Sequence, residues 1–295
     1  ISENNAWKML HKMLEINPIA FEKNLLDKLG IEKEQAKPEK EKLAQRQQHL
    51  SKILSGSFGT LTVLTEIAVK VLPKPLSNKT IVIDNPHLKN ALKYLNVALS
   101  SSSDPSGAVF YPDYFRDHFS LNDLTVEGAL TAIRIEGPID SVDQRINKLR
   151  SELKISTENV SILDPEQSNL FWEKTQNLSV FNQTNDNLIR VVVPPSRTFE
   201  LIQKLKKYKI NYFIDWGGNL IWLAISKLSS KSLKEIGSII KEAEGYFIII
   251  KIEKHLKAQV DIFVSDPIKY KISEKIKTSF DPRRILNPGK MYTGI

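Results

Sequence analysis

The feature that most constrains the fold is an order of strands and helices that occurs twice. Between residues 79 and 252, short runs rich in β-branched residues alternate with longer segments of helical periodicity. Each series reads strand, helix, strand, strand, helix, strand. The first runs KTIVID, HLKNALKYLNVAL, GAVFYP, LTAIRIEG, SVDQRINKLRSEL and NVSILD (79–164), and the second LIRVVVP, SRTFELIQKLKKY, NYFIDWG, LIWLAIS, SLKEIGSIIKEAE and YFIIIKI (188–252). This βαββαβ order is that of a ferredoxin-like unit. The sequence therefore predicts an α+β fold with antiparallel sheets that helices cover on one face.

Three further elements are predicted from local patterns. The segment 165–179 joins the two series and is expected to be a helix, with Asp164 as N-cap and Pro165 at the first helical position. The run YFIIIKI is too apolar for an exposed edge, so we expect a central strand there. A nearly uninterrupted apolar run, 61–72, is expected to be one long strand after a turn of small residues.

The composition excludes several kinds of site. The chain of 295 residues has no cysteine, which excludes disulfides, thiolate metal sites and a cysteine nucleophile. Its five histidines lie far apart in the sequence and form no metal-binding pair, so no metal is expected. The net charge of +8 comes mostly from lysines dispersed along helix-like segments. That pattern favours solvated surfaces over a nucleic-acid partner.

Three stretches remain as candidate sites, and each has an alternative explanation. In SGSFGT (55–60), small residues would let the backbone approach a pyrophosphate or a flavin, or would simply form a turn. In IDWGG (214–218), Asp215, Trp216 and Gly217 would contact a ligand or partner, or only close a hairpin. In SFDPRRILNPGKMY (279–292), Asn287, Gly289 and Lys290 would lie beside a cofactor, or only end the last helix.

Taken together and in this order, the stretches resemble FAD-linked oxidases of the vanillyl-alcohol oxidase (PCMH) type. GSFGTLTVLTEIAVKVLPKP is similar to the last flavin-contacting loop and strand of that family's FAD domain. LIRVVVPPS, IDWGGNLIWL and FDPRRILNPGKMY are similar to later landmarks of the FAD-binding subunits of bacterial glycolate oxidases. The resemblance covers roughly residues 50–295. One departure is EGYFIII, where Tyr246 or Phe247 stands in place of a histidine of the family's pattern.

The resemblance implies a domain organisation. Residues 50–77 would be the C-terminal edge of an FAD-binding domain, 78–265 a cap of two βαββαβ units, and 266–295 a segment that returns to the flavin. Residues 1–49 differ from the family and are expected to be a helical or linker segment. The pyrophosphate loop of the family has no counterpart in this sequence, which predicts a truncated FAD domain.

The resemblance also implies a site, a cofactor and partners. FAD would lie along a set of residues from both ends of the chain: Gly56, Ser57, Phe58, Gly59, Thr60, Leu61, Thr65, Glu66, Asn287, Gly289 and Lys290. No catalytic residue is carried over. The implied activity is oxidation of glycolate or another 2-hydroxy acid through FAD. The implied setting is a cytoplasmic complex, peripheral at the inner membrane, with a second FAD-binding subunit and an iron–sulfur subunit. The alternative is a non-catalytic docking subunit of that complex that no longer holds FAD.

Overall fold

The computed structural model describes residues 50–84, 86–119, 128–155, 159–182, 184–257, 260, 267–292 and 295. The chain divides into two compact units. The sheet unit is Ile67–Asp266, and the terminal unit combines Ile1–Glu66 with Pro267–Ile295. The expectation of a helical or linker segment in residues 1–49 lies outside the described residues.

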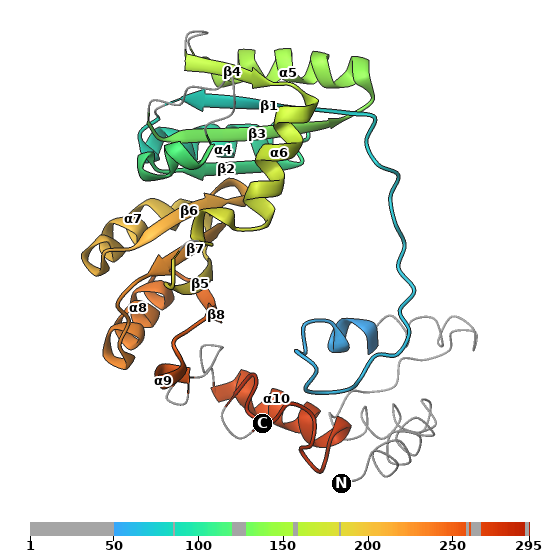
Figure 1. The fold of residues 1–295 in the computed structure, drawn as a ribbon, viewed down its shortest axis with the longest axis vertical. Helices are drawn as coiled ribbons and strands as arrows, with labels where there is room; N and C mark the ends of the chain where they lie inside the picture. Colours follow the sequence, from blue (N-terminus) through green and yellow to red (C-terminus); the bar gives the residue numbers. More distant parts are fainter. Residues whose placement is uncertain are drawn as a thin grey trace. The chain divides into compact units, whose positions relative to one another are not determined.

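The described residues of the sheet unit form one eight-stranded sheet, in the order β4-β1-β3-β2-β6-β7-β5-β8 (Figure 1). Every neighbouring pair is antiparallel. The strands are β1 (Ser77–Asp84), β2 (Gly107–Tyr111), β3 (Leu130–Gly137), β4 (Val160–Leu163), β5 (Asn187–Val192), β6 (Asn211–Asp215), β7 (Leu220–Ile225) and β8 (Tyr246–Lys251).

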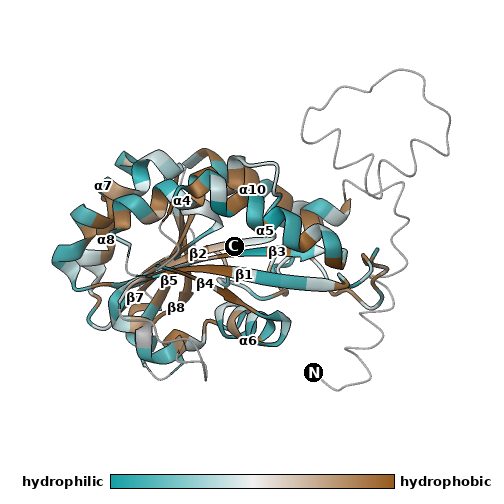
Figure 2. Cartoon of the chain, turned by 90° about the horizontal axis from the view of Figure 1, so that it is seen from above, coloured by the Kyte–Doolittle hydropathy of each residue, from teal (hydrophilic) through white to brown (hydrophobic). Residues whose placement is uncertain are grey.

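Four helices lie on one face of this sheet (Figure 2). They are α4 (Leu88–Ser100), α5 (Ile139–Leu153), α7 (Pro195–Leu205) and α8 (Ser230–Glu242). Each buries a stripe at helical spacing, such as Ala91, Leu92, Leu95 and Ala98 of α4. Short helical turns η1 (Asp113–Phe119), η4 (Lys206–Tyr208) and η5 (Trp216–Gly218) and the short helix α9 (Lys254–Lys257) complete the connections. The predicted α+β class and both βαββαβ series are confirmed.

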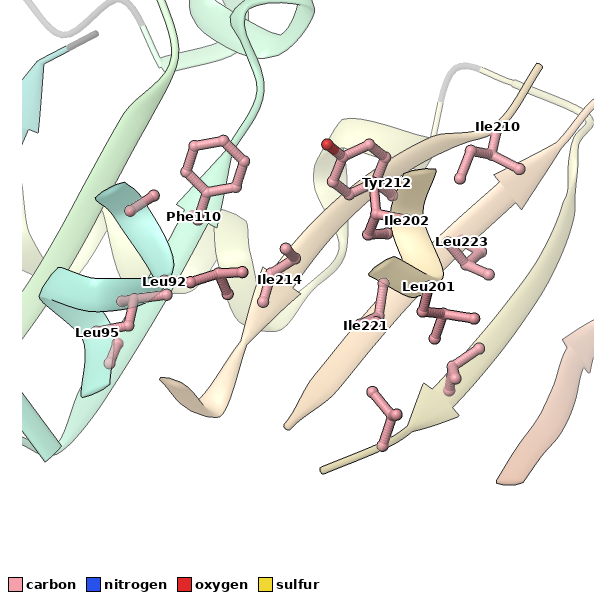
Figure 3. Close-up of a cluster of buried hydrophobic side chains, with 14 of the residues drawn as sticks. Leu92, Leu95, Phe110, Leu201, Ile202, Ile210, Tyr212, Ile214, Ile221 and Leu223 are labelled. Carbon is pink, nitrogen blue, oxygen red and sulfur yellow. The ribbon is translucent and has the colours of Figure 1, made fainter. Parts of the chain in front are cut away.

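The two βαββαβ units share one sheet and one core, although the sequence patterns described them only as tandem units. The units meet where Phe110 of β2 pairs with Ile214 of β6. Figure 3 shows Leu92 and Leu95 of α4 beside Phe110 and Ile214, next to apolar side chains of the second unit. The core therefore runs continuously under all four covering helices.

The other face of the sheet carries α6 (Pro165–Gln176), followed by η3 (Ser179–Phe181). The predicted helix start is confirmed, because the Asp164 carboxylate accepts from the Gln167 amide at 2.9 Å and Pro165 is the first helical residue. Rings from α6, η3 and the sheet pack together on this face, among them Tyr111, Phe171, Phe181 and Phe213. This aromatic cluster fixes α6 against the strands of the first unit.

Two strand predictions are wrong. The run YFIIIKI forms β8 at an edge of the sheet and pairs only with β5 among the described residues. It is apolar because Phe247 and Ile249 face the helices, while Tyr246 and Ile250 on the opposite face are about half exposed. Residues 61–72 form no strand, because within the described part of the chain no strand pairs with them. Apart from Leu61, which is buried, the large apolar side chains of this run are exposed, from 52% at Val63 to 84% at Leu72.

Gly217 provides a test of how the β6–β7 connection packs. Its φ of +67° is costly for a residue with a Cβ, and an added Cβ would lie 2.1 Å from Leu99 Cδ1. We expect Gly217→Ala to lower the free energy of unfolding by about 1–2 kcal/mol through the left-handed backbone. The Leu99 side chain can rotate away, so the loss should persist in a Gly217→Ala, Leu99→Ala double variant relative to Leu99→Ala alone. Urea denaturation measures both differences, and a gain in stability from Gly217→Ala would contradict this packing.

Candidate functional site

The turn 55–60 is a bare backbone loop in the terminal unit. Residues 50–54 are helical, and the chain then turns through the bonds Ser57 N to Leu54 O (3.2 Å) and Thr60 N to Ser57 O (2.9 Å). Gly56, Phe58 and Gly59 have φ values of +78°, +53° and +68°. Two of these three left-handed positions are glycines, which adopt that conformation without strain. The small residues of this stretch are therefore required by the turn itself.

The C-terminal segment packs directly on this turn. Helix α10 (Pro267–Phe280) is followed by an irregular stretch, 281–292, which is the return segment. Asn287 Nδ2 donates to Phe58 O at 2.9 Å, and Thr60 Oγ1 lies 3.5 Å from Met291 Sδ. Two of the three candidate stretches, far apart in the sequence, therefore form one structure.

A buried lysine holds these segments together. The Lys277 side chain on α10 is 1% exposed, and its Nζ donates to Thr60 O (2.6 Å), Leu286 O (2.7 Å) and Asp281 Oδ2 (2.8 Å). Its three donors thus reach the turn, the return segment and a carboxylate one helical turn away. A buried charge is tolerated only with such complete pairing, so each of the three segments depends on the other two.

Asp281 completes this arrangement. Its Oδ2 also accepts from the Leu286 amide at 2.8 Å. Burial opposes ionisation of this carboxyl. The hydrogen bonds from Lys277, Leu286 and Ile285 outweigh burial and hold the Asp281 pKa below its ordinary value. The Asp281 carboxyl is therefore ionised at neutral pH.

An open pocket of about 590 Å³ lies over the turn. Its wall is formed by residues on both sides of the turn and by the return segment: Leu54, Ser55, Gly56, Ser57, Phe58, Gly59, Thr62, Val63, Leu64, Ile285, Leu286 and Asn287. A Cβ added at Gly56 would meet nothing within 4 Å, so the backbone there faces open space. Among the described residues, the Gly56 and Gly59 amides donate no hydrogen bond. The pocket can therefore accept an oxygen-rich or planar ligand against bare backbone.

The other residues expected along FAD lie near or outside this pocket. Thr60 and Leu61 are buried beneath the turn, and Thr60 Oγ1 donates to Ser57 O at 2.7 Å. The remaining four are exposed and do not line the pocket: Thr65, Glu66, Gly289 and Lys290. The Lys290 amide donates to Asn287 O at 3.2 Å, which keeps the return segment folded back on itself.

The IDWGG stretch belongs to the sheet unit and is described separately. The Asp215 carboxylate accepts from the Trp216 amide at 2.7 Å, Trp216 is 55% exposed, and Gly217 is buried against α4. Burial raises the pKa of Asp215 to about 6, although the Trp216 hydrogen bond and the charge of Arg190 act in the opposite direction. Asp215 therefore changes its charge close to neutral pH.

The described residues contain neither a metal-binding cluster nor a membrane-spanning helix. In that part of the chain, no three His, Cys, Asp or Glu side chains lie together in a way that could hold a metal ion. No helix among the same residues is long and apolar enough to cross a membrane.

The sequence patterns did not single out Lys277 or Asp281. Their four-residue spacing places them on one face of α10, but lysines are frequent on this helix and usually lie in solvent. The usable signal was an acidic residue directly after a helix and before a proline, near the start of a segment already considered for a site.

Replacing Lys277 tests the buried pair. Lys277→Met leaves the buried Asp281 carboxylate without its cation and two buried carbonyl groups without a partner, so we expect a loss of about 3–5 kcal/mol in local stability. Native-state hydrogen exchange of the amides of Thr60 and Leu286 measures it as faster exchange. Lys275→Met, an exposed lysine on the same helix, is the matched control and should leave exchange unchanged. Equal exchange in the two variants would contradict a structural role for Lys277.

The pH dependence of stability tests the environment of Asp215. Because folding raises this pKa from 3.8 to about 6, its contribution to stability is present below pH 4 and lost as the pH rises through 6. Asp215→Asn keeps an oxygen that accepts from Trp216 and removes the titration. Between pH 4 and pH 7.5, the free energy of unfolding of the wild type should therefore fall by at most about 3 kcal/mol relative to the variant. The fall should be smaller than this limit because the carboxyl is only half-buried. Parallel denaturation curves at both pH values would refute this assignment.

Comparison with known proteins adds relatives in sequence. No protein-family model matches the chain. It is 22% identical over 281 residues to the glycolate oxidase subunit GlcD of Bacillus subtilis (strain 168). It is 26% identical over 250 residues to the glycolate oxidase subunit GlcE of Escherichia coli (strain K12). Each match covers 82% of this chain and 57% of the relative, so the chain spans little more than half the length of these proteins.

The fold has relatives among solved structures. An alkyldihydroxyacetonephosphate synthase matches with a TM-score of 0.50 and 17% sequence identity, over 80% of this chain and 49% of the synthase. At this identity the match concerns the fold alone. The resemblance drawn from GSFGT, IDWGG and NPGKMY is confirmed, and by sequence the chain is a relative of bacterial glycolate oxidase subunits.

Proposed function

We propose that the chain is an FAD-binding subunit of an oxidase complex that converts 2-hydroxy acids, such as glycolate, to 2-oxo acids. The observation that carries the proposal is the pocket shared by the turn 55–60 and the return segment 285–287. The relatives GlcD and GlcE are both named as glycolate oxidase subunits, which supports the reaction and the assembly.

The residues of the pocket fit a flavin nucleotide on three counts. The backbone at Gly56 faces open space, so a flat ring or a phosphate can approach it closely. The amides of Gly56 and Gly59 are available as donors to ligand oxygens. Phe58, a residue 44% exposed, lies in the pocket wall, where its ring would pack against a planar group.

In this proposal the chain would position the cofactor, and FAD would accept two electrons and one proton as a hydride from the substrate carbon, while the hydroxyl proton is released. Gly56, Ser57 and Gly59 hold the ligand through their backbone. Asn287 fixes the turn by its hydrogen bond to Phe58 O. Lys277 fixes the turn and the return segment through its hydrogen bonds to Thr60 O and Leu286 O. The proposal also places FAD near Thr60, Leu61, Thr65, Glu66, Gly289 and Lys290, which lie outside the lining of the pocket.

The domain organisation follows from this assignment. Residues 50–77 would be the C-terminal edge of the FAD-binding domain, and 78–265 would be the cap. Residues 266–295 would be the C-terminal part that returns to the flavin side, and residues 1–49 a preceding helical or linker segment. The partners would be a second FAD-binding subunit and an iron–sulfur subunit at the cytoplasmic face of the inner membrane.

One observation favours a second candidate function, a docking subunit that holds no flavin. Between the turn and β1, side chains such as Val63, Ile67, Val69 and Leu72 are more than half exposed. Exposed apolar residues in series mark a surface that a partner covers. In this alternative the run 61–76 binds another subunit, and the pocket stays without FAD.

Flavin binding separates the two candidates. The purified chain, with added FAD, should show the flavin absorption bands and quench free flavin fluorescence. Gly59→Glu should weaken this binding by at least tenfold, because it places a side chain and a negative charge in the pocket beside Asn287. Ser238→Glu, exposed on α8, adds the same charge elsewhere and should bind FAD like the wild type. A colourless chain that takes up no added FAD would favour the docking subunit.

A further inference from the structure

One part of the sheet has a face that no described helix covers. On the side opposite α4, α5, α7 and α8, helix α6 and the aromatic cluster cover the strands of the first unit and Phe213 of β6, and the cluster also includes buried Ala224 of β7 and Leu188 of β5. Beyond Phe213, the strands β7, β5 and β8 show half-buried Trp222, Arg190 and Ile248 and half-exposed Tyr246. This part of the face is therefore partly exposed in the described structure of the sheet unit.

Arg190 is flanked by apolar and aromatic residues on this face. The strand register places Phe213, Trp222, Arg190 and Ile248 side by side in one row across four strands. The three neighbours are apolar or aromatic, and Trp222 stacks on Phe213 with ring centroids 6.3 Å apart. In the described part of the chain, the guanidinium has no hydrogen-bond or ion-pair partner.

An unpartnered guanidinium in such a row is a receptor for a carboxylate. Its planar fork of donors matches the two oxygens of a carboxylate, and an apolar surrounding strengthens the pair. The aromatic ring of Trp222 lies next to it and can pack against an apolar or flat substituent of the same ligand.

Asp215 lies on the same face, one row further along. It follows Phe213 by two residues on β6, so both side chains point to the same side of the sheet. The charge of Arg190 acts on its carboxyl, and among the described residues no ion pair joins the two groups. The two groups are thus separate, with Trp222 and Leu220 of β7 between their strands.

We propose that Arg190, Trp222 and Asp215 form a binding site for a 2-hydroxy carboxylate on the open face of the sheet. Arg190 pairs with the ligand carboxylate, Trp222 packs against its substituent, and Asp215 forms a hydrogen bond with its hydroxyl group. The choice of a hydroxy acid rests on the proposed function, whereas the preference for a carboxylate rests on Arg190 itself.

The test uses the full chain without flavin, so that its outcome is independent of FAD binding. Mandelate, an aromatic 2-hydroxy acid, is titrated at pH 7 and followed by calorimetry and tryptophan fluorescence. We expect saturable binding that Arg190→Gln weakens by at least tenfold and Arg190→Lys weakens less. Arg197→Gln, on the helix-covered side and paired with Glu244, is the matched control and should bind like the wild type.

Further probes assign each group. Methyl mandelate, which lacks the charge, should bind no better to the wild type than to Arg190→Gln. The fluorescence change should disappear in Trp222→Phe and persist in Trp216→Phe. Phenylacetate lacks the hydroxyl group, so Asp215→Asn should weaken mandelate binding and leave phenylacetate binding unchanged.

Several results would overturn the proposal. Equal mandelate binding by the wild type and a folded Arg190→Gln variant, judged by its thermal unfolding, would remove Arg190 from the site. An unaltered signal in Trp222→Phe would place the ligand elsewhere. Absence of mandelate binding in a chain that takes up FAD would reject this site and leave the proposed function standing, whereas carboxylate binding without FAD uptake would do the reverse.

Discussion

The terminal unit depends on one buried ammonium group, Lys277 Nζ. It donates to a carbonyl of the turn, to a carbonyl of the return segment and to the Asp281 carboxylate, all within 2.8 Å. None of these acceptors can be lost without leaving a buried charge or carbonyl unpaired, and that cost exceeds the gain from any single contact at the surface. The turn is consequently held in place by groups beneath it, and the backbone at Gly56 faces open space on the pocket side. The candidate site is therefore a product of long-range packing rather than of the local motif alone.

Much of the fold could be predicted from the sequence, because its signals are local. An apolar stripe at helical spacing, such as Ala91, Leu92 and Leu95, predicts a helix. Alternating apolar runs predict strands, and Asp164 before Pro165 indicates where a helix starts. The order of these elements then leaves few topologies, and the antiparallel arrangement follows. The meeting of GSFGT with the NPGK segment was likewise predictable, but only from the resemblance to a known family and not from the residues themselves.

The features that could not be predicted depend on contacts with residues that are distant in the sequence. The apolar run 61–72 has the composition of a strand, yet a strand exists only where another pairs with it. The edge position of β8 could not be predicted because Phe247 and Ile249 are apolar where they pack against the covering helices, as they would also be in a central strand. Lys277 resembles the solvent-exposed lysines around it, and its burial is set by acceptors distant in sequence, such as Thr60. Arg190 could have been noticed as a lone charge within LIRVVV, but only the strand register shows that its neighbours across the sheet are apolar.

The central claim is that the turn 55–60 and the return segment 285–287 form one wall of a flavin site. Photolabelling of the full chain with an azido derivative of FAD, followed by peptide mapping, tests it most directly. The account predicts labelled peptides from both segments, competed away by excess FAD and lost together in a Gly59→Glu variant. Labelling confined to the sheet unit, or labelling of either segment that excess FAD does not reduce, would contradict it.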